Sequence, residues 1–310
     1  MKISVIIPVY NGEKTVEQLT NEILDTTGNS LFEIILVNDG SRDKSESILE
    51  KLSTKNEKIK FISLRKNFGE HNAVMCGLNF MSGDAAVIMD DDGQNPATEI
   101  LKLVHEAEKG FDVVYAQYNR KKHRAARNFA GRMNDKLANL LLKKPKDLYL
   151  NSFKLIKKEI VDELIKYKGP SPYIDGLIFR TTDNIGKTET EHAGRKSGKS
   201  NYTIGKLVSL CFNLFFNFSI LPLRILTVTG FIAFIIGFIL SLYFIINKII
   251  YPDEVLGWTS TIVAILVFSG AQLIFLGLIG EYIGKQYFDQ NKTPQWVIKK
   301  KNITKKDVEL

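Results

Sequence analysis

Three consecutive aspartates, Asp90, Asp91 and Asp92, follow an apolar run in the segment "AAVIMDDDGQNPATEI". Like charges placed side by side repel one another, and folding alone gives no reason for the arrangement. In extended backbone, side chains two positions apart point to the same face, so Asp90 and Asp92 could act together while Asp91 points elsewhere. Two carboxylates combined with diphosphate oxygens are a usual way to hold Mg²⁺ or Mn²⁺, because these hard cations prefer oxygen. The spacing predicts a metal site, with a solvated acidic turn as the alternative.

Three further polar loops, "PVYNG", "NDGS" and "RKNFGEH", also separate an apolar run from an amphipathic segment. In open α/β sheets, ligands bind outside the carboxyl ends of the strands. Four such loops are therefore expected to line one cleft, and their convergence is stronger evidence for a ligand site than any single loop.

The elements that must position these loops can be read from the same stretch. Near-continuous apolar runs predict strands covered on both faces: "ISVIIPV", "FEIILVND", "KIKFISLR", "AAVIMDD" and "FDVVYAQ". Amphipathic segments at residues 13–25 and 41–55 predict helices, and Asn95 followed by Pro96 predicts the cap and first turn of another. The alternation predicts an α/β fold with an open, mainly parallel sheet, and one or two more strands are expected within residues 171–202.

The last third of the chain differs in composition from the rest. Uncharged runs at residues 225–247 and 258–280 each reach the roughly 20 residues that a bilayer core requires. Residues 204–218 are apolar and aromatic, which predicts either a helix in the membrane interface or a buried helix. Basic residues flank the outer ends of the two runs, whereas the connecting loop offers only Lys248. The positive-inside rule then places both ends in the cytoplasm.

This pattern divides the chain into four parts. A cytoplasmic α/β domain is expected at residues 1–203 and a juxtamembrane interfacial helix at 204–221. Two transmembrane helices are expected within 222–284, followed by a basic cytoplasmic tail at 285–310. The formal net charge of +8 is then explained by the anionic inner leaflet, and nucleic acid is disfavoured as a partner.

Four segments resemble the family 2 glycosyltransferases of the GT-A fold: "SVIIPVYNGEKTV", "ILVNDGSRDKS", "LRKNFGEHNAVMCGL" and "VIMDDDGQNPATEI". More narrowly, the chain is similar to the polyprenyl-phosphate glycosyltransferases, which include bactoprenol glucosyltransferases, the undecaprenyl-phosphate aminoarabinose transferase and dolichyl-phosphate mannose synthase. The resemblance continues through "HAGRKSGKSNY", "PLRIL" and "GAQLIFLGLIGEYIGKQYFD". It implies inverting transfer of a sugar from a nucleotide diphosphate sugar, expected to be UDP-linked, to undecaprenyl phosphate. It also implies a multi-pass protein of the bacterial inner membrane, and a tetramer.

The resemblance also implies roles for single residues. Asp39 would accept a hydrogen bond from the base, although it could instead only start a turn with Gly40. Asp90 and Asp92 would hold the metal, and Arg195, Ser200 and Tyr202 would close over the phosphates. The nucleotide-sugar site would comprise Pro8, Tyr10, Glu13, Asp39, Lys66, Gly69, Asp90, Asp91, Gln94, Ser200 and Tyr202. The candidate catalytic residues are Asp92, Asp147 and Arg195, and the lipid phosphate would bind Arg127 and Arg132, for which surface solvation is the alternative.

One position departs from several relatives, which carry an acid before the Phe-Arg of the segment that matches "LNSFKLI". Here that position is Ser152, and Asp147 is the nearest acid upstream. A phosphate monoester has a second pKa of about 6, so the lipid acceptor is already largely a dianion at neutral pH. Such a nucleophile needs orientation and charge neutralisation more than proton removal. A site without an obligatory base therefore fits a lipid phosphate acceptor better than a sugar hydroxyl.

Other classes of function fit the sequence less well. A polysaccharide synthase would carry a Gln-x-x-Arg-Trp signature, which the chain lacks, and two spans are few for an export channel. A catalytically silent membrane protein that binds nucleotide sugars stays open as an alternative, although intact Asp39, Asp90 and Asp92 argue against it. A dehydrogenase is disfavoured, because no G-x-G-x-x-G follows the first apolar run.

Overall fold

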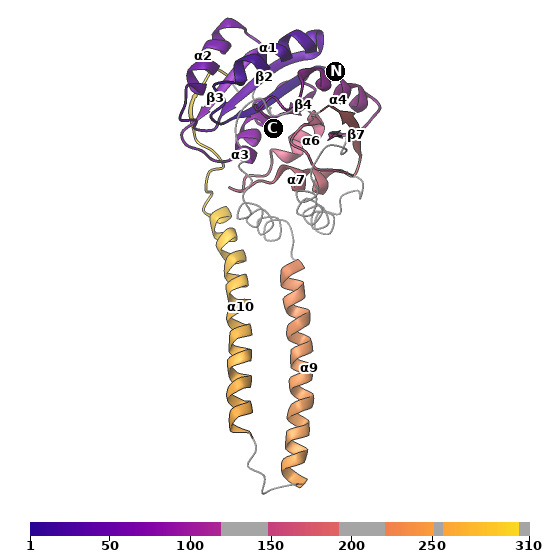
Figure 1. Cartoon of the computed structure of the whole chain (residues 1–310), viewed down its shortest axis with the longest axis vertical. Helices are drawn as coiled ribbons and strands as arrows, with labels where there is room; N and C mark the ends of the chain where they lie inside the picture. Colours follow the sequence, from indigo (N-terminus) through magenta and orange to yellow (C-terminus); the bar gives the residue numbers. More distant parts are fainter. Residues whose placement is uncertain (119–147, 192–220, 251–256, 304–310) are drawn as a thin grey trace. The chain divides into compact units, whose positions relative to one another are not determined.

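The computed structural model describes residues 1–118, 148–191, 221–250 and 257–303 (Figure 1). The chain forms two compact units. The first, here called the α/β unit, comprises Met1–Thr203 together with Asn291–Leu310, and the second, the helical unit, comprises Ile204–Gln290.

The five predicted strands are confirmed as β1 (Ile3–Val9), β2 (Leu31–Asn38), β3 (Ile59–Leu64), β4 (Ala85–Ile88) and β5 (Val113–Tyr118). Strand β7 (Ile185–Thr190) confirms a strand within residues 171–202, and the described residues add β6 (Lys154–Lys157) and β8 (Ile298–Lys301). The sheet order is β7-β5-β6-β4-β1-β2-β3-β8. Strand β1 pairs in parallel with β2 and β4, but β6 runs antiparallel to both β4 and β5, and β8 runs antiparallel to β3. The sheet that was expected to be mainly parallel is therefore mixed: four of the pairings between described strands are parallel, and the three antiparallel ones all involve β6 or β8.

Helices cover both faces of the sheet. Helices α1 (Val16–Thr27), α2 (Ser45–Lys55) and α4 (Ile100–Glu108) bury their apolar side chains in one cluster with alternate residues of β1 and β2. Helix α3 (Glu70–Leu78) packs on the other face, where a methyl group at Gly77 would lie 2.5 Å from Ile6.

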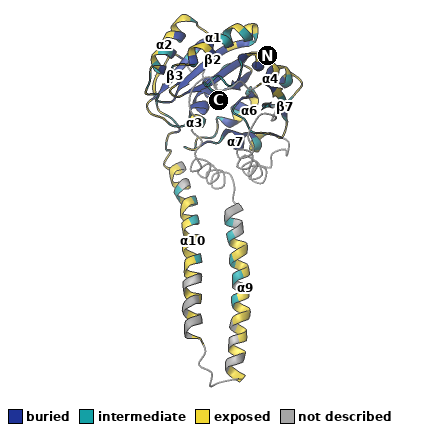
Figure 2. Ribbon diagram, viewed as in Figure 1, coloured by how far each residue is buried: buried dark blue, intermediate teal, exposed yellow. Residues whose placement is uncertain are grey.

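Helices α6 (Lys158–Leu164) and α7 (Ile174–Thr181) also pack against one another. Two 3₁₀ turns, η1 (Gly28–Ser30) and η2 (Ala97–Glu99), complete the helical elements described in the α/β unit. Figure 2 shows the strands buried between helices whose outer surfaces are exposed.

The predicted cap at Asn95 is wrong. The 3₁₀ turn η2 precedes α4, and the Asn95 side chain makes no capping hydrogen bond to it. The carboxamide oxygen of Asn95 instead accepts a hydrogen bond from the Tyr118 hydroxyl at the end of β5. A local cap was therefore displaced by a long-range partner that the sequence pattern did not reveal.

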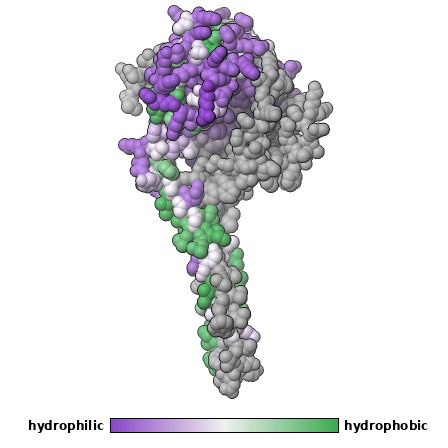
Figure 3. Space-filling view, turned by 60° about the vertical axis from the view of Figure 1, so that its left-hand side comes forward, coloured by the Kyte–Doolittle hydropathy of each residue, from purple (hydrophilic) through white to green (hydrophobic). Residues whose placement is uncertain are grey.

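The described part of the helical unit consists of α9 (Leu221–Ile250) and α10 (Trp258–Gln290), which are 30 and 33 residues long. Large apolar side chains are exposed along both helices, among them Phe231, Ile249, Leu273 and Ile283. On the face that Figure 3 shows, hydrophobic residues gather along this unit, whereas the α/β unit presents mainly hydrophilic ones. Among the residues that the structure describes, no helix combines the length and the apolar character needed to cross a membrane. Two membrane spans therefore stay a prediction.

Candidate active site

The loops that follow β1 and β2 hold one another in place. The backbone N–H of Gly12 donates to the Ser45 hydroxyl over 3.0 Å, and the N–H of Glu13 donates to the Asp43 carboxylate over 3.1 Å. In return, the carboxylate of Glu13 accepts the backbone N–H of Lys44 over 3.1 Å. These contacts engage Glu13, a predicted nucleotide-site residue, in fixing the first two loops.

The carboxylate of Asp39 joins the second loop to the third. It accepts backbone N–H groups from Phe68 over 2.7 Å and from Gly69 over 2.9 Å, and the residue is only 3% exposed. Burial raises the pKa of Asp39, and the two hydrogen bonds oppose that rise. Asp39 thus positions the loop that begins α3, and its predicted contact with a base stays a prediction.

Gly40 allows the backbone of the second loop to lie directly against the backbone of the third loop. Its φ is +65°, and a methyl group there would lie 2.4 Å from the carbonyl carbon of Lys66 and 2.6 Å from the nitrogen of Asn67. A side chain at this position would therefore meet backbone atoms as well as being strained.

Substituting Gly40 by Ala is expected to destabilise the protein strongly, with Gly28→Ala as the matched control. Gly28 also has a positive φ, +51°, but a methyl group there would meet nothing within 4 Å. Gly28→Ala should lower the free energy of unfolding by about 1 kcal/mol through backbone strain alone. Gly40→Ala should cost about 1–3 kcal/mol more, because overpacking is added to strain. Urea denaturation of both variants measures the difference, and equal losses would mean that the two loops do not pack as described.

The three aspartates at the end of β4 turn to different partners. The Ser152 hydroxyl donates to the Asp90 carboxylate over 2.6 Å. Asp91 lies against the first loop, where the Tyr10 backbone N–H donates to it and a methyl group at Gly12 would lie 2.3 Å from its Oδ2. That Oδ2 atom is buried without a hydrogen-bond partner. Burial raises the pKa of Asp91 to about 7, and the neighbouring Asp90 charge acts in the same direction. Negative charge is thus concentrated at this strand end.

Asp92 closes the turn that follows the strand. Its Oδ1 accepts the backbone N–H of Gln94 over 3.0 Å. Among the described residues, no group of three or more His, Cys, Asp or Glu side chains is arranged to hold a metal by itself. A cation at this strand end would therefore need ligands beyond these side chains.

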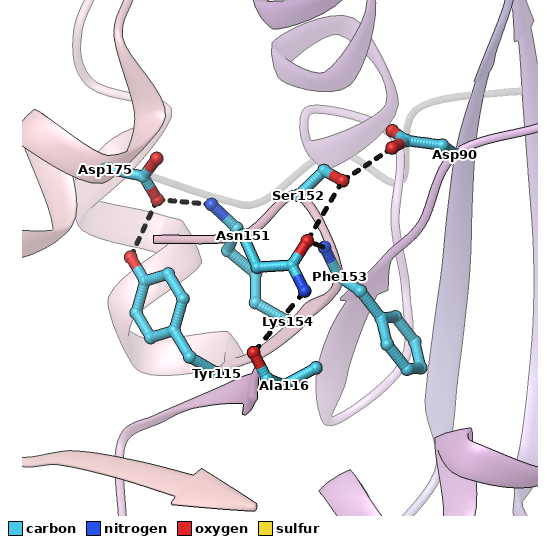
Figure 4. Close-up of polar contacts among 8 residues, drawn as sticks. All are labelled: Asp90, Tyr115, Ala116, Asn151, Ser152, Phe153, Lys154 and Asp175. Carbon is cyan, nitrogen blue, oxygen red and sulfur yellow. Dashed lines mark hydrogen bonds and ion pairs between the residues drawn. The ribbon is translucent and has the colours of Figure 1, made fainter. Parts of the chain in front are cut away.

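A buried charged network lies next to the aspartates (Figure 4). Lys154 on β6 forms an ion pair with Asp175 in the first turn of α7, and both side chains are less than 10% exposed. The hydroxyl of Tyr115 donates to the same carboxylate oxygen over 2.7 Å, and burial keeps the pKa of Tyr115 well above its usual value. Ser152 contacts Asp90, and Lys154, two positions later, contacts Asp175. The short segment at the start of β6 therefore connects the Asp90 carboxylate to the first turn of α7.

The first turn of α3 lies within the electrostatic reach of both groups. Glu70 is exposed, and its pKa is raised by desolvation of its carboxylate and by the Asp90 charge, whereas Lys154 opposes the rise. Desolvation lowers the pKa of His71 to about 4, so its imidazole is neutral at pH 7. The His71 ring packs edge-on against Tyr173, with 5.3 Å between ring centroids.

The described residues bring together most of the predicted nucleotide-sugar set. Pro8 lies within β1 and pairs with Val37 of β2, Tyr10 is exposed in the first loop, and the Lys66 Nζ atom lies 5.1 Å from the centroid of the Phe68 ring. Gly69 is the N-cap residue of α3, with a φ of +95°. Predicted residues outside the described part of the chain are Arg127, Arg132, Asp147, Arg195, Ser200 and Tyr202, as is the predicted juxtamembrane segment.

Sequence reasoning missed the ion pair of Lys154 and Asp175 and the position of Glu70. One signal was available, since Lys154 interrupts the apolar run "FKLI" and Asp175 interrupts "YIDGLIF". Lysine and aspartate side chains are almost never fully buried unless they are paired. A charged residue inside an apolar segment is therefore a sign of a buried ion pair.

The comparisons with known proteins agree with this arrangement. Residues 4–165 match the family described as "Glycosyl transferase family 2", and residues 221–285 match the "GtrB C-terminal hairpin". The chain belongs to glycosyl transferase family 2. It is therefore a glycosyltransferase.

Individual relatives within this family cover nearly the whole chain. The chain is 33% identical over 307 residues to the undecaprenyl-phosphate 4-deoxy-4-formamido-L-arabinose transferase of Proteus mirabilis, covering 96% of this chain and 93% of that protein. It is 29% identical over 307 residues to the uncharacterized glycosyltransferase YkcC of Bacillus subtilis, covering 97% and 94%.

A solved structure shows the same fold. It is glucosyl-3-phosphoglycerate synthase from Mycobacterium tuberculosis, in complex with Mn²⁺, uridine diphosphate and glucosyl-3-phosphoglycerate. The TM-score is 0.53 at 19% identity, and the match covers 69% of this chain and 77% of that one. The GT-A-like α/β architecture of this family 2 chain is thereby confirmed.

Proposed function

We propose that this glycosyltransferase moves a sugar from a UDP-linked donor to undecaprenyl phosphate, with inversion at the anomeric carbon. The observation that carries the proposal is the carboxylate cluster of Asp90, Asp91 and Asp92, which follows β4 and contacts the loop after β1. The acceptor is supported by the name of the Proteus mirabilis relative, which aligns along nearly the whole chain. The UDP donor rests on the sequence resemblance.

The carboxylates at the end of β4 fit a divalent cation, Mg²⁺ or Mn²⁺. Burial and the neighbouring Asp90 charge raise the pKa of Asp91, so a positive charge would be favoured there. Asp90 and Asp92 would hold the ion, with donor diphosphate oxygens completing its coordination, as Mg²⁺ sites commonly require. When bound, the metal would neutralise the charge that develops on the departing diphosphate.

The residues of the chain would bind and orient the two substrates. Asp39 and Glu13 hold the loops on the nucleotide side, and the Ser152 hydroxyl holds Asp90. With Ser152 in the place of an acid, the acceptor phosphate would enter as its dianion and attack without giving up a proton. Arg127 and Arg132 remain the proposed contacts of that phosphate.

The helical unit would anchor the enzyme where its acceptor lies. Helices α9 and α10 expose large apolar side chains along their length, and the matching family hairpin spans residues 221–285. We propose that both helices span the bacterial inner membrane, with the catalytic unit on the cytoplasmic side. A homotetramer is proposed from the sequence resemblance alone.

Transfer into lipid tests the proposed function directly. Membranes containing the full chain would be incubated with undecaprenyl phosphate, Mn²⁺ and a panel of radiolabelled UDP-sugars. We expect label from one donor to enter the organic phase and EDTA to abolish its transfer. The control reaction omits undecaprenyl phosphate.

Two outcomes of this assay would contradict the proposal. Label in a water-soluble or precipitable polymer would indicate a polysaccharide-extending enzyme. Transfer that persists undiminished in EDTA would remove the metal from the proposal.

A further inference from the structure

The segment at residues 291–303, here called the C-terminal strap, is built into the α/β unit as an edge of its sheet. Strand β8 pairs with β3, and the Arg65 backbone N–H donates to the Val297 carbonyl over 2.9 Å where β3 ends. Beyond the strand, the Asn302 side chain accepts the backbone N–H of Phe61 over 2.6 Å. The expected basic tail thus contains a strand whose main-chain hydrogen bonds fix it beside the loop that leads into α3.

The charged side chains of the strap contribute less to this attachment. Lys299 pairs with Glu46 and Lys300 with Glu50, both over 2.9 Å, but both lysines are more than half exposed. Exposed ion pairs of this kind contribute at most about 1 kcal/mol each. They therefore supply suitable control positions.

Gln295 is the buried polar anchor of the strap. It is 6% exposed, and its Nε2 atom donates to the carbonyls of Tyr167, over 3.0 Å, and Gly169, over 2.7 Å. A carboxamide has two N–H donors, so both are used on the loop between α6 and α7. This loop is thereby fixed by a side chain more than 120 residues away in the sequence.

The loop held by Gln295 continues into the candidate active site. The Asn72 side chain donates to the Pro170 carbonyl over 3.2 Å and to the Phe68 carbonyl over 2.8 Å, so it links this loop to the one before α3. Tyr173 then packs against His71, and Asp175 two positions later pairs with buried Lys154. Displacement of the loop would therefore disturb the contact of Tyr173 with His71 and that of Asp175 with Lys154.

We propose that Gln295 is a positioning residue for sugar transfer. It holds the loop between α6 and α7 so that the first turns of α3 and α7 keep the geometry that transfer requires. The strap follows α10 directly in the chain. The segment that holds the loop between α6 and α7 is therefore also the first segment after the helical unit. This inference rests on the proposed function.

The test uses the full chain purified in detergent, with two measurements for each variant. Calorimetry with UDP and Mn²⁺ counts the molecules that bind nucleotide, and the lipid-transfer assay gives kcat/KM per binding molecule. Gln295→Met keeps the length of the side chain but removes both donors, and Gln295→Asn keeps the donors on a shorter stem. Lys300→Ala in the same strap is the control.

We expect Gln295→Met to lower kcat/KM about tenfold, since small misplacement of reacting groups costs large factors in rate. UDP affinity should stay within about twofold, because Asp39 still holds the loop before α3 when the Gln295 hydrogen bonds are lost. Gln295→Asn should give an intermediate value, and Lys300→Ala should match the wild type.

Equal kcat/KM per binding molecule in all variants would overturn the inference and leave Gln295 with a structural role. If Gln295→Met does not fold, a wild-type value for Gln295→Asn overturns the inference and a reduced one supports it. A wild type that neither binds UDP nor transfers sugar would instead overturn the proposed function, and the inference with it.

Discussion

Replacing Asp92 by Asn is expected to lower sugar transfer by about 10³-fold, which corresponds to about 4 kcal/mol of transition-state stabilisation. The amide keeps the oxygen that accepts the Gln94 backbone N–H, so the turn after β4 should survive. It removes the negative charge that would hold the divalent cation on the donor diphosphate. Because like charges are crowded there, the fold should not be destabilised by the loss of one of them.

The measurement compares lipid transfer with metal-dependent UDP binding in the same preparation. In the wild type, UDP should bind more tightly with Mn²⁺ than with EDTA, and in Asp92→Asn this difference should shrink or vanish. Asp162→Asn is the matched control, because it makes the same exchange at an exposed carboxylate paired with Lys158. Transfer by Asp92→Asn at the wild-type rate would remove the metal proposal.

The sequence predicts the parts of the fold that depend on local pattern. Strands β1 to β5 are near-continuous apolar runs, and each was recognised because burial on both faces leaves that mark. Strand β6 escapes prediction because lysine stands at both ends of its short apolar core, which breaks the apolar run. Strand β8, "IKKK", reads as a charged tail, because an edge strand can leave charged side chains in solvent.

The candidate site likewise has one part that local sequence predicts and another part that it does not predict. The position of Asp90, Asp91 and Asp92 after a strand, and of Asp39 in a loop after another, follows from local sequence. Their partners do not, because Ser152 meets Asp90 across 62 positions and Lys154 meets Asp175 only through the antiparallel register of β6. Nothing local specifies that register.

Breaking the buried ion pair of Lys154 and Asp175 is expected to cause the largest loss of stability. Asp175→Ala would leave a buried ammonium without its carboxylate, and the Tyr115 hydroxyl without its acceptor. Removing one partner of a buried pair costs about 3–5 kcal/mol. Lys154→Met should cost less, since the remaining carboxylate keeps Tyr115 as a donor and lies in the first turn of α7, where negative charge is favoured.

The double variant separates the cost of an unpaired charge from the worth of the pair. Lys154→Met with Asp175→Leu replaces both charges by apolar groups, so it should recover most of the stability that Asp175→Ala loses.

Lys158→Met provides the control: it removes the lysine from a Lys–Asp pair on the surface, whose side chains are 37% and 45% exposed. That change should cost at most about 1 kcal/mol. Urea denaturation of the four variants gives the comparison. If Asp175→Ala cost no more than Lys158→Met, water would have to reach Lys154, and the network could not be what holds α7 against the sheet.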